Sequence, residues 1–224
     1  MGQFSFAQKL GAEALGSFFL FVTVVGSGIM AENLSDGNIA IALLGNTLAT
    51  GAILFVLIAV LAPVSGAHFN PAVTLVMALR KELSAGQGVS FVVAQLIGGI
   101  IGVWAAHFMF ELPVLQYSEK TRTGSGQWLG ELIATFGLLF TILGTMKFRP
   151  EWVAPAVGLY ISAGYWFTSS TSFANPAITV GRAFSNTFAG IAPENVLAFV
   201  VAQFVGAISA WVIVGWLFQD KSEA

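Results

Sequence analysis

Charged residues are scarce in this chain. Asp, Glu, Lys and Arg together make up only 9% of the sequence, whereas soluble domains carry about 25%. This leaves too little polar surface to cover a water-facing globule, and the mean hydropathy of +0.83 indicates that lipid surrounds most of the chain. The composition therefore predicts an integral membrane protein.

Cysteine is absent, which excludes a disulfide framework, a thiolate nucleophile and a cysteine-ligated metal. The two histidines, His68 and His107, are too few for a histidine-rich metal site. We therefore expect no metal and no cofactor. The net charge of -2 argues against nucleic acid as a partner.

Six stretches are apolar and close to the roughly 20 residues that a spanning helix needs. The first exceeds the roughly 7–15 residues of a signal-peptide core, so we expect it to remain as a span. The fifth is short and should need its flanks to complete the crossing. The six predicted spans are Ala7–Met30, Ile39–Ala62, Gly88–Phe110, Gln127–Lys147, Val153–Thr168 and Val196–Phe218.

The basic residues predict the orientation of these spans in the plasma membrane. Cytoplasmic loops carry an excess of Lys and Arg, so the face with six basic residues is expected inside and the face with three outside. Six spans then put both termini in the cytoplasm, and the polar linker, about residues 111–126, outside. The inner set is Lys9, Arg80, Lys81, Lys147, Arg149 and Lys221, and the outer set is Lys120, Arg122 and Arg182.

Two further apolar pieces, Pro71–Leu79 and Pro176–Phe184, are too short to span. Each opens on Asn-Pro-Ala, formed by Asn70, Pro71 and Ala72 in the first and by Asn175, Pro176 and Ala177 in the second. Pro suits the first position of a helix and Asn suits the cap before it. Both pieces are therefore predicted to be re-entrant half-helices.

The two halves of the chain repeat each other. GAEALGSFFLF in the first half resembles LGELIATFGLLF in the second, and VVAQLIGGIIGVWAA resembles VVAQFVGAISAW. Each repeat, about 7–110 and 127–218, holds three spans, so the second enters the membrane inverted within a single domain, 1–224. Inverted repeats place the functional site near the midplane, where the halves meet. The equivalent pairs are Glu13 with Glu131, Asn70 with Asn175, and Gln95 with Gln203.

The paired Asn-Pro-Ala turns are the most specific feature of the sequence. One copy alone would indicate only a helix cap, but two equivalent copies in inverted repeats are expected to meet at the centre of the membrane. Each half-helix then aims its positive end at the same point. We expect each Asn carbonyl to cap its own helix and each NH₂ to point into a pore and donate to a passing oxygen.

These features resemble the aquaporin, or major intrinsic protein, family. The resemblance rests on SGAHFNPAVT, FANPAIT, the AE near the start and the AQ of the third span, and it extends over nearly the whole chain. It implies a homotetramer of six tilted helices and two half-helices per subunit, with one pore in each. It also implies a passive channel for water and small neutral solutes, and no enzyme.

The resemblance assigns roles to five polar residues. Glu13 and Glu131 are expected to accept hydrogen bonds from the backbone of the re-entrant loops, and acid–base catalysis by them is not expected. Gln95 and Gln203 should hold the same loops or line their edges. His68 should line the cytoplasmic side of the pore, with a structural histidine in a tight loop as the alternative.

The second loop departs from the family pattern. Most members read Asn-Pro-Ala-Arg there, and that arginine forms the narrowest filter, whereas this chain has Ile178. The expected filter positions are filled by Thr50, Ser172 and Ile178, with either Tyr165 or Ala163 from the fifth span. Such a ring has no cation and should be wider than that of a strict water channel.

Arg182 lies four residues after Ile178 and seven after Asn175, so the three share one helix face. It could be a displaced filter charge in the outer vestibule. It could also snorkel to the outer interface, which is the interpretation that we favour from the sequence.

The segments TSSTSFANPAIT and SNTFAGIAP resemble a bacterial subgroup found with arsenic-resistance genes, which also lacks the filter arginine. This resemblance implies transport of arsenous acid and methylated arsenicals, which are uncharged, hydroxylated and close to glycerol in size. A strict water channel and an ion-conducting channel remain the alternatives.

Overall fold

The structure, a computed structural model, describes residues 4–219, and this part contains helices and no strand. The helices are α1 Phe6–Leu34, α2 Ile39–Ser65, α3 Pro71–Leu79, α4 Ala85–Met109, α5 Ser125–Phe148, the 3₁₀ turn η1 Pro150–Trp152, α6 Val153–Phe167, α7 Pro176–Arg182 and α8 Pro193–Leu217.

The predicted all-α membrane fold is confirmed. Five helices, α1, α2, α4, α5 and α8, are long and apolar enough to cross a membrane. The sixth, α6, has 15 residues, or about 22 Å at 1.5 Å per residue, and η1 precedes it as the expected flank. Lys221, predicted to be cytoplasmic, lies outside the described residues.

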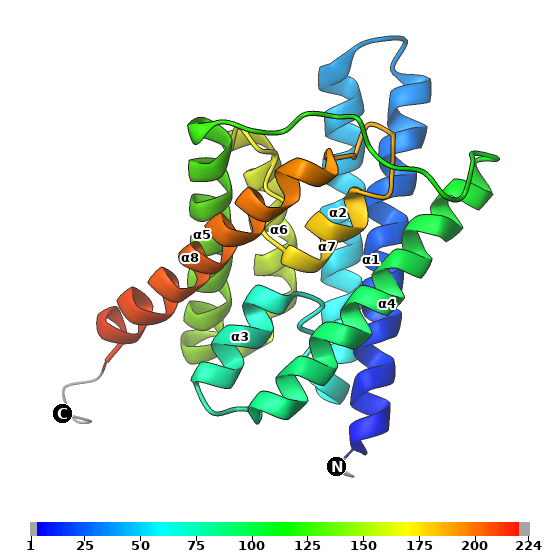
Figure 1. Cartoon of the computed structure of the whole chain (residues 1–224). Helices are drawn as coiled ribbons and strands as arrows, with labels where there is room; N and C mark the ends of the chain where they lie inside the picture. The colour runs from blue at the N-terminus through cyan, green and yellow to red at the C-terminus, as the bar shows by residue number, and fades with distance from the viewer. Residues whose placement is uncertain (1–3, 220–224) are drawn as a thin grey trace.

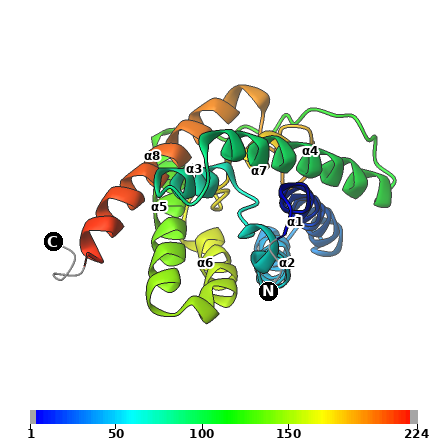
Figure 2. The same cartoon turned by 90° about the horizontal axis from the view of Figure 1, so that it is seen from below.

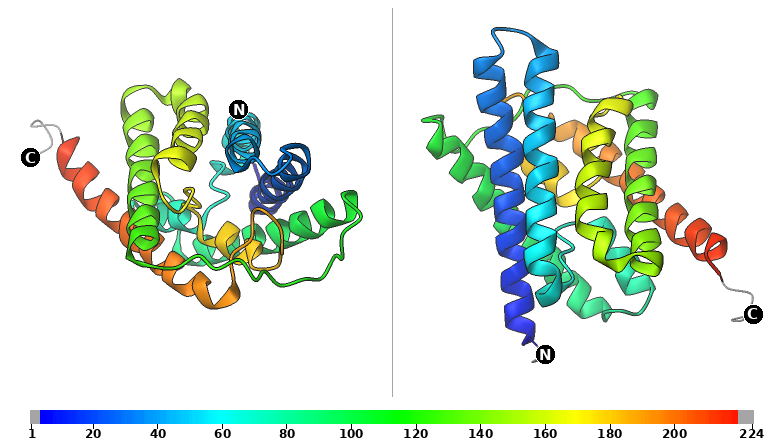
Figure 3. Two further views of the ribbon diagram at one scale, coloured as in Figure 1. Left: turned by 90° about the horizontal axis from the view of Figure 1, so that it is seen from above. Right: turned by 180° about the vertical axis from the view of Figure 1, so that it is seen from behind.

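The two halves have the same internal arrangement. In the first half α1 packs on α2 and α4, and in the second α5 packs on α6 and α8. Figures 2 and 3 show the two pairs α1–α2 and α5–α6 side by side, with α4 and α8 crossing behind them. We call the end where α1 begins the N-terminal face and the opposite end, crossed by residues 110–124, the linker face (Figure 1).

The half-helices α3 and α7 contact each other between the halves, and their first residues lie near the centre of the bundle (Figure 1). The bounds of α3 match the prediction. The second half-helix ends at Arg182, two residues before the predicted Phe184. It ends there because the N–H of Phe184 bonds to the carbonyl of Gly181, which tightens the last turn out of α-helical geometry.

Two equivalent glycines let the long helices of each half approach closely. A Cβ at Gly98 would lie 2.0 Å from the carbonyl oxygen of Ala14, and one at Gly206 would lie 2.3 Å from that of Leu132. Only a residue without a side chain fits at these crossings of α1 with α4 and of α5 with α8.

The backbone before each half-helix is left-handed at residues that are not glycine. Ala67 and Phe69 have φ values of 53° and 48°, and Ser172 and Ala174 have 50° and 47°. Such conformations cost of order 1–3 kcal/mol each and persist only where the surroundings hold them.

The fully buried carboxylate of Glu13 holds the first of these loops. Its Oε1 accepts from the N–H of His68 at 3.0 Å, and its Oε2 accepts from the N–H of Phe69 at 2.8 Å. Ser65 Oγ and Gln95 Nε2 donate to the same carboxylate at 2.7 and 2.8 Å. Four donors therefore converge on one buried anion.

Glu131 holds the second loop in the same way. Its two oxygens accept from the N–H groups of Phe173 and Ala174, both at 2.9 Å. Gln203 Nε2 donates to Oε2 at 2.6 Å and to Thr179 Oγ1 at 2.8 Å, so the loop and α7 are tied to α5 and α8.

Replacing Gly98 by Ala is expected to destabilise the protein. The new methyl group meets the α1 backbone, and overpacking of this kind costs about 1–3 kcal/mol. The matched control is Gly86→Ala in the same helix, where a Cβ meets nothing within 4 Å. Thermal unfolding in detergent should show a lower melting temperature for Gly98→Ala and an unchanged melting temperature for Gly86→Ala. Equal melting temperatures would contradict the close packing of α1 and α4.

Replacing Glu13 or Glu131 by Gln should also lower stability. The amide keeps one acceptor oxygen and turns an NH₂ toward N–H donors, and each lost bond to a buried charged group costs about 1.5–3 kcal/mol. Glu32→Gln, on the exposed end of α1, is the control. We expect a lower melting temperature and a lower yield of folded protein for Glu13→Gln and Glu131→Gln, and no change for Glu32→Gln. A stable variant with altered solute preference would instead make these glutamates selectivity residues.

Candidate functional site

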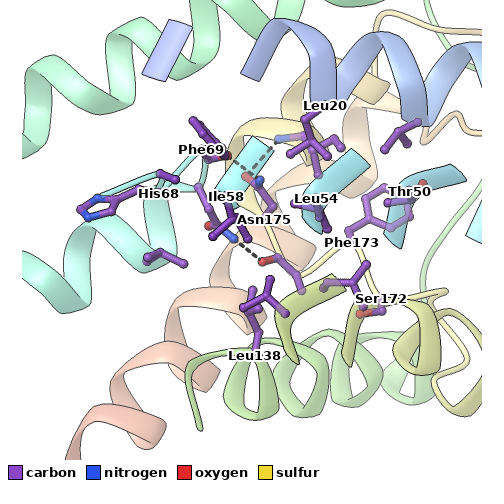
Figure 4. A pocket seen from close by; sticks show the side chains of 18 of the residues that line it. Leu20, Thr50, Leu54, Ile58, His68, Phe69, Leu138, Ser172, Phe173 and Asn175 are labelled. Carbon is purple, nitrogen blue, oxygen red and sulfur yellow. Dashed lines mark hydrogen bonds between the residues drawn. The ribbon is translucent and has the colours of Figure 1, made fainter. Parts of the chain in front are cut away.

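A cavity of about 60 Å³ lies at the centre of the bundle where the halves meet. Figure 4 shows His68 at one end of it, Asn175 in the middle, and Thr50 and Ser172 at the other end. One water needs about 10–15 Å³ on this measure, so the cavity holds several. A second cavity of about 180 Å³ at the N-terminal face shares His68 with the first, so His68 borders both.

Both Asn-Pro-Ala turns line this cavity through their asparagines, and each asparagine caps its own half-helix. Asn70 Oδ1 accepts from the N–H of Ala72 at 2.9 Å, and Asn175 Oδ1 accepts from those of Ala177 and Ile178 at 2.9 and 3.3 Å. The prolines occupy the first helical position in both, as the sequence predicts.

The asparagine NH₂ groups are less free than the sequence suggested. Asn70 Nδ2 donates to the carbonyl of Ala174 at 2.7 Å, and Asn175 Nδ2 donates to the carbonyl of Phe69 at 2.8 Å (Figure 4). Each NH₂ has two N–H bonds, so one joins the two loops and one remains for a molecule in the cavity. The left-handed loops turn these carbonyls toward the opposite asparagine, and the expected donation to a passing oxygen stays a prediction for the second N–H bond of each group.

Four residues expected in the filter line the same cavity: Thr50, Tyr165, Ser172 and Ile178. Thr50 Oγ1 and the Tyr165 hydroxyl lie 3.2 Å apart and share a hydrogen bond. Ser172 Oγ is buried and has no hydrogen-bond partner within residues 4–219. The alternative Ala163 is wrong: it is exposed on the outside of α6, because it is two residues and thus about 200° of helix away from Tyr165.

His68 lines the cavity and is also held in place. Its ring Nδ1 lies 3.1 Å from Thr74 Oγ1, and the ring packs edge-on against Phe91 with centroids 5.5 Å apart. The two expectations for this residue, a lining role and a structural role, are therefore compatible.

Arg182 is buried, with only 2% of its surface exposed, and it lines the cavity. Its guanidinium carbon lies 3.3 Å from the centroid of the Phe173 ring, and its Nε donates to the carbonyl of Ala189. The favoured expectation that it snorkels to the interface is wrong. The chain after α7 folds back over it, and the N–H of Ile191 bonds to the carbonyl of Arg182 at 3.3 Å.

Sequence reasoning missed Arg122, which it counted only as an outer charge. This linker residue is 9% exposed, and its Nε and Nη1 donate to the carbonyls of Gly190 and Ser170 at 2.8 and 3.3 Å. Its guanidinium carbon lies 5.0 Å from the Phe173 ring centroid. No signal in the polar linker separates it from the neighbouring basic residue, Lys120.

Lys120 adds to the positive charge of the linker face. It donates to the carbonyl of Phe188 at 2.8 Å. Burial, followed by the nearby charges of Arg122 and Arg182, lowers its pKa to about 8.

The site is suited to holding small molecules by hydrogen bonds. Its polar groups are hydroxyls, amides, an imidazole and a guanidinium, and none of the residues lining the cavity is a carboxylate. Within residues 4–219, no three His, Cys, Asp or Glu side chains gather as a metal site would require.

Comparisons with known proteins agree with this geometry. The family model described as Major intrinsic protein matches residues 1–151. Aquaglyceroporin AqpS of Rhizobium meliloti is 52% identical over 219 residues, covering 98% of this chain and 94% of that protein. Nodulin-26 of Glycine max is 32% identical and covers 96% of this chain and 80% of its own.

The fold has a counterpart among solved structures. The aquaglyceroporin from Plasmodium falciparum superposes with a TM-score of 0.75, over 93% of this chain and 95% of its own. The two sequences are only 21% identical, so this likeness shows the fold alone. Together with the family match and the identity to the relatives, this settles the class of protein. The chain belongs to the major intrinsic protein family, and it is a membrane channel for water and small solutes rather than an enzyme.

Proposed function

We propose that the central cavity is the permeation path and that it passes uncharged solutes larger than water, in particular glycerol-like polyols, arsenous acid and methylated arsenicals. The observation that carries this is Ile178, which lines the cavity where most of the family has arginine. In this proposal Thr50, Tyr165, Ser172 and Ile178 form the filter, and the asparagines of the Asn-Pro-Ala turns form the midpoint.

The chemistry of the lining supports this class of solute. Thr50 and Tyr165 bring hydroxyl groups to the lining, and Ile178 and Phe173 add apolar surface. A polyol or arsenous acid presents hydroxyls that can bond to these hydroxyl groups, and a less polar body that can contact the apolar surface. The 52% identity to a protein named aquaglyceroporin supports the same solute class.

An ion-conducting channel is the alternative from another class. A cation passing this cavity would lose hydration, and the lining offers it no carboxylate in return but does include the guanidinium of Arg182. This observation favours neutral solutes over cations.

The assembly and orientation are part of the proposal. We place the protein in the plasma membrane as a homotetramer, with residues 1–224 forming one channel domain. The N-terminal face, and with it both termini, lies in the cytoplasm, because the basic residues Arg80, Lys81 and Arg149 follow helices that end there. Large apolar side chains on the outer surface, including Phe108, Leu159 and Trp216, suit contact with lipid or with other subunits.

Replacing Ile178 by Arg is expected to narrow the filter. Stopped-flow light scattering on proteoliposomes should show glycerol and arsenous acid flux reduced about tenfold relative to water flux, since a barrier higher by 1.4 kcal/mol slows a step by that factor. Ile178→Leu, which conserves volume, is the control and should keep the wild-type ratio.

Two results would contradict the proposal. Wild-type protein that passes water and excludes both larger solutes would be a strict water channel. Wild-type protein that carries sodium or protons at rates near its water flux, measured by conductance and by a trapped pH dye, would be an ion channel.

A further inference from the structure

The linker between α4 and α5 brings a buried charge close to the filter without adding it to the cavity wall. Figure 1 shows the linker crossing the linker face, and its backbone bonds to residues that follow α7: the N–H of Ser118 to the carbonyl of Ala183, and the N–H of Ala192 to the carbonyl of Lys120. Arg122 is 9% exposed and does not line the cavity. Its effect on a solute must therefore act through the residues that it holds.

Arg122 joins three segments that are distant in the sequence. Its backbone N–H donates to Asn195 Oδ1, in the first turn of α8, at 2.9 Å. Its side chain donates from Nε to the carbonyl of Gly190, after α7, at 2.8 Å, and from Nη1 to the carbonyl of Ser170, before α7, at 3.3 Å. A guanidinium is a rigid, planar fork of donors. The side chain therefore ties together the two segments that flank α7.

The segment before α7, residues 168–175, forms one wall of the cavity. It contributes Ser172, Phe173, Ala174 and Asn175 to the lining. Three of its residues have left-handed backbone, which persists only where the surroundings hold it. A Cβ at Gly164 would lie 2.6 Å from Ser172 Oγ, so the segment packs on the turn of α6 that carries Tyr165. Its position therefore affects the distance from Tyr165 to Ile178 of α7.

The two loops before the half-helices are anchored differently. Ser65 and Ser170 are equivalent, because each lies five residues before the asparagine of its loop. The hydroxyl of Ser65 donates to Glu13. Within residues 4–219 the hydroxyl of Ser170 makes no bond to Glu131, and the carbonyl of Ser170 instead accepts from Arg122. In the second loop the linker thus supplies an anchor that a serine hydroxyl supplies in the first.

Arg122 also approaches the side chain that this loop points into the cavity. Its guanidinium carbon lies 5.0 Å from the centroid of the Phe173 ring, within the range of a cation–π contact. Glu131 binds the N–H of Phe173 at 2.9 Å. The loop is therefore held by an anion from α5 and by a cation from the linker.

We propose that Arg122 is a positioning residue of the filter, which holds residues 168–174 toward α7 and so limits the width of the pore between Tyr165 and Ile178. This inference rests on the proposed function, because it takes the cavity to be the permeation path. It extends that function by assigning part of the filter width to a linker residue that lies outside the cavity.

The test compares erythritol with glycerol in the same proteoliposomes, with flux through protein-free liposomes subtracted. Erythritol is the larger polyol, and the ratio of the two fluxes does not depend on how much protein is inserted. Arg122→Gln shortens the side chain, so that it cannot reach both carbonyls. We expect it to raise the erythritol-to-glycerol ratio about fivefold, because the loss of roughly one hydrogen bond raises the population of displaced loop positions by that factor.

A second variant covers the case in which Arg122→Gln does not fold. Arg122→Lys keeps the buried positive charge and the backbone bond to Asn195, but an ammonium lacks the planar fork that bonds two carbonyls at once. It should therefore also raise the ratio, and it separates the bridging hydrogen bonds from the charge alone.

Two control variants separate positioning from general effects. Lys120→Gln removes a charge from the same linker, at a side chain that bonds to the carbonyl of Phe188 after α7. Gly98→Ala strains the crossing of α1 with α4, away from the filter. Both should keep the wild-type ratio, although Gly98→Ala lowers the melting temperature.

Each result decides between these possibilities. Folded Arg122→Gln or Arg122→Lys protein with the wild-type ratio would overturn this inference and leave the proposed function intact. A control variant that raises the ratio as much as Arg122→Gln would attribute the effect to lost charge or lost stability and overturn it as well. Wild-type protein that passes water and neither polyol would overturn the proposed function together with this inference.

Discussion

Irregular backbone at membrane depth needs hydrogen-bond partners inside the protein, and two buried carboxylates meet this need here. Lipid offers no partners to a free N–H, so a loop at the midplane persists only where protein satisfies it. Glu13 and Glu131 each accept from two consecutive backbone N–H groups of such a loop. The left-handed residues in both loops, the position of each half-helix and the course of the cavity all depend on these bonds.

The same constraint joins the two halves. Once the loops are held, their carbonyls at Phe69 and Ala174 face the asparagine of the opposite loop, and the two reciprocal bonds measure 2.8 and 2.7 Å. Each asparagine thus caps its own helix with its oxygen and ties the other loop with its nitrogen. These two bonds connect the loops directly at the midpoint of the cavity.

The sequence predicted the features that depend on local chemistry and on the repeat. The predicted bounds of α3, Pro71–Leu79, match the structure. The two glutamates that the repeat makes equivalent, Glu13 and Glu131, do hold equivalent loops. The sequence analysis failed where a residue's surroundings are formed by segments that are distant in the sequence. Arg182 is covered by the segment around Ala189, and its contact with Phe173 depends on a loop conformation that composition does not encode. The choice between Tyr165 and Ala163 depends on which face of α6 is turned toward the cavity. Counting residues back from Asn175 cannot give this, because the length of the intervening loop is not known from the sequence.

The symmetry of the repeats is broken in one half of the cavity, and this bears on where selection occurs. Counted from the two asparagines, Val73 corresponds to Ile178 and both line the cavity, whereas Met77 corresponds to Arg182 and does not line it. The guanidinium of Arg182 therefore lies on the linker-face side of the midpoint, and no other arginine lines the cavity. A passive channel cannot use this asymmetry to drive net transport, because its states are at equilibrium with both solutions. The asymmetry instead means that a solute crossing the cavity from either face meets the only guanidinium of its lining on the linker-face side of the midpoint.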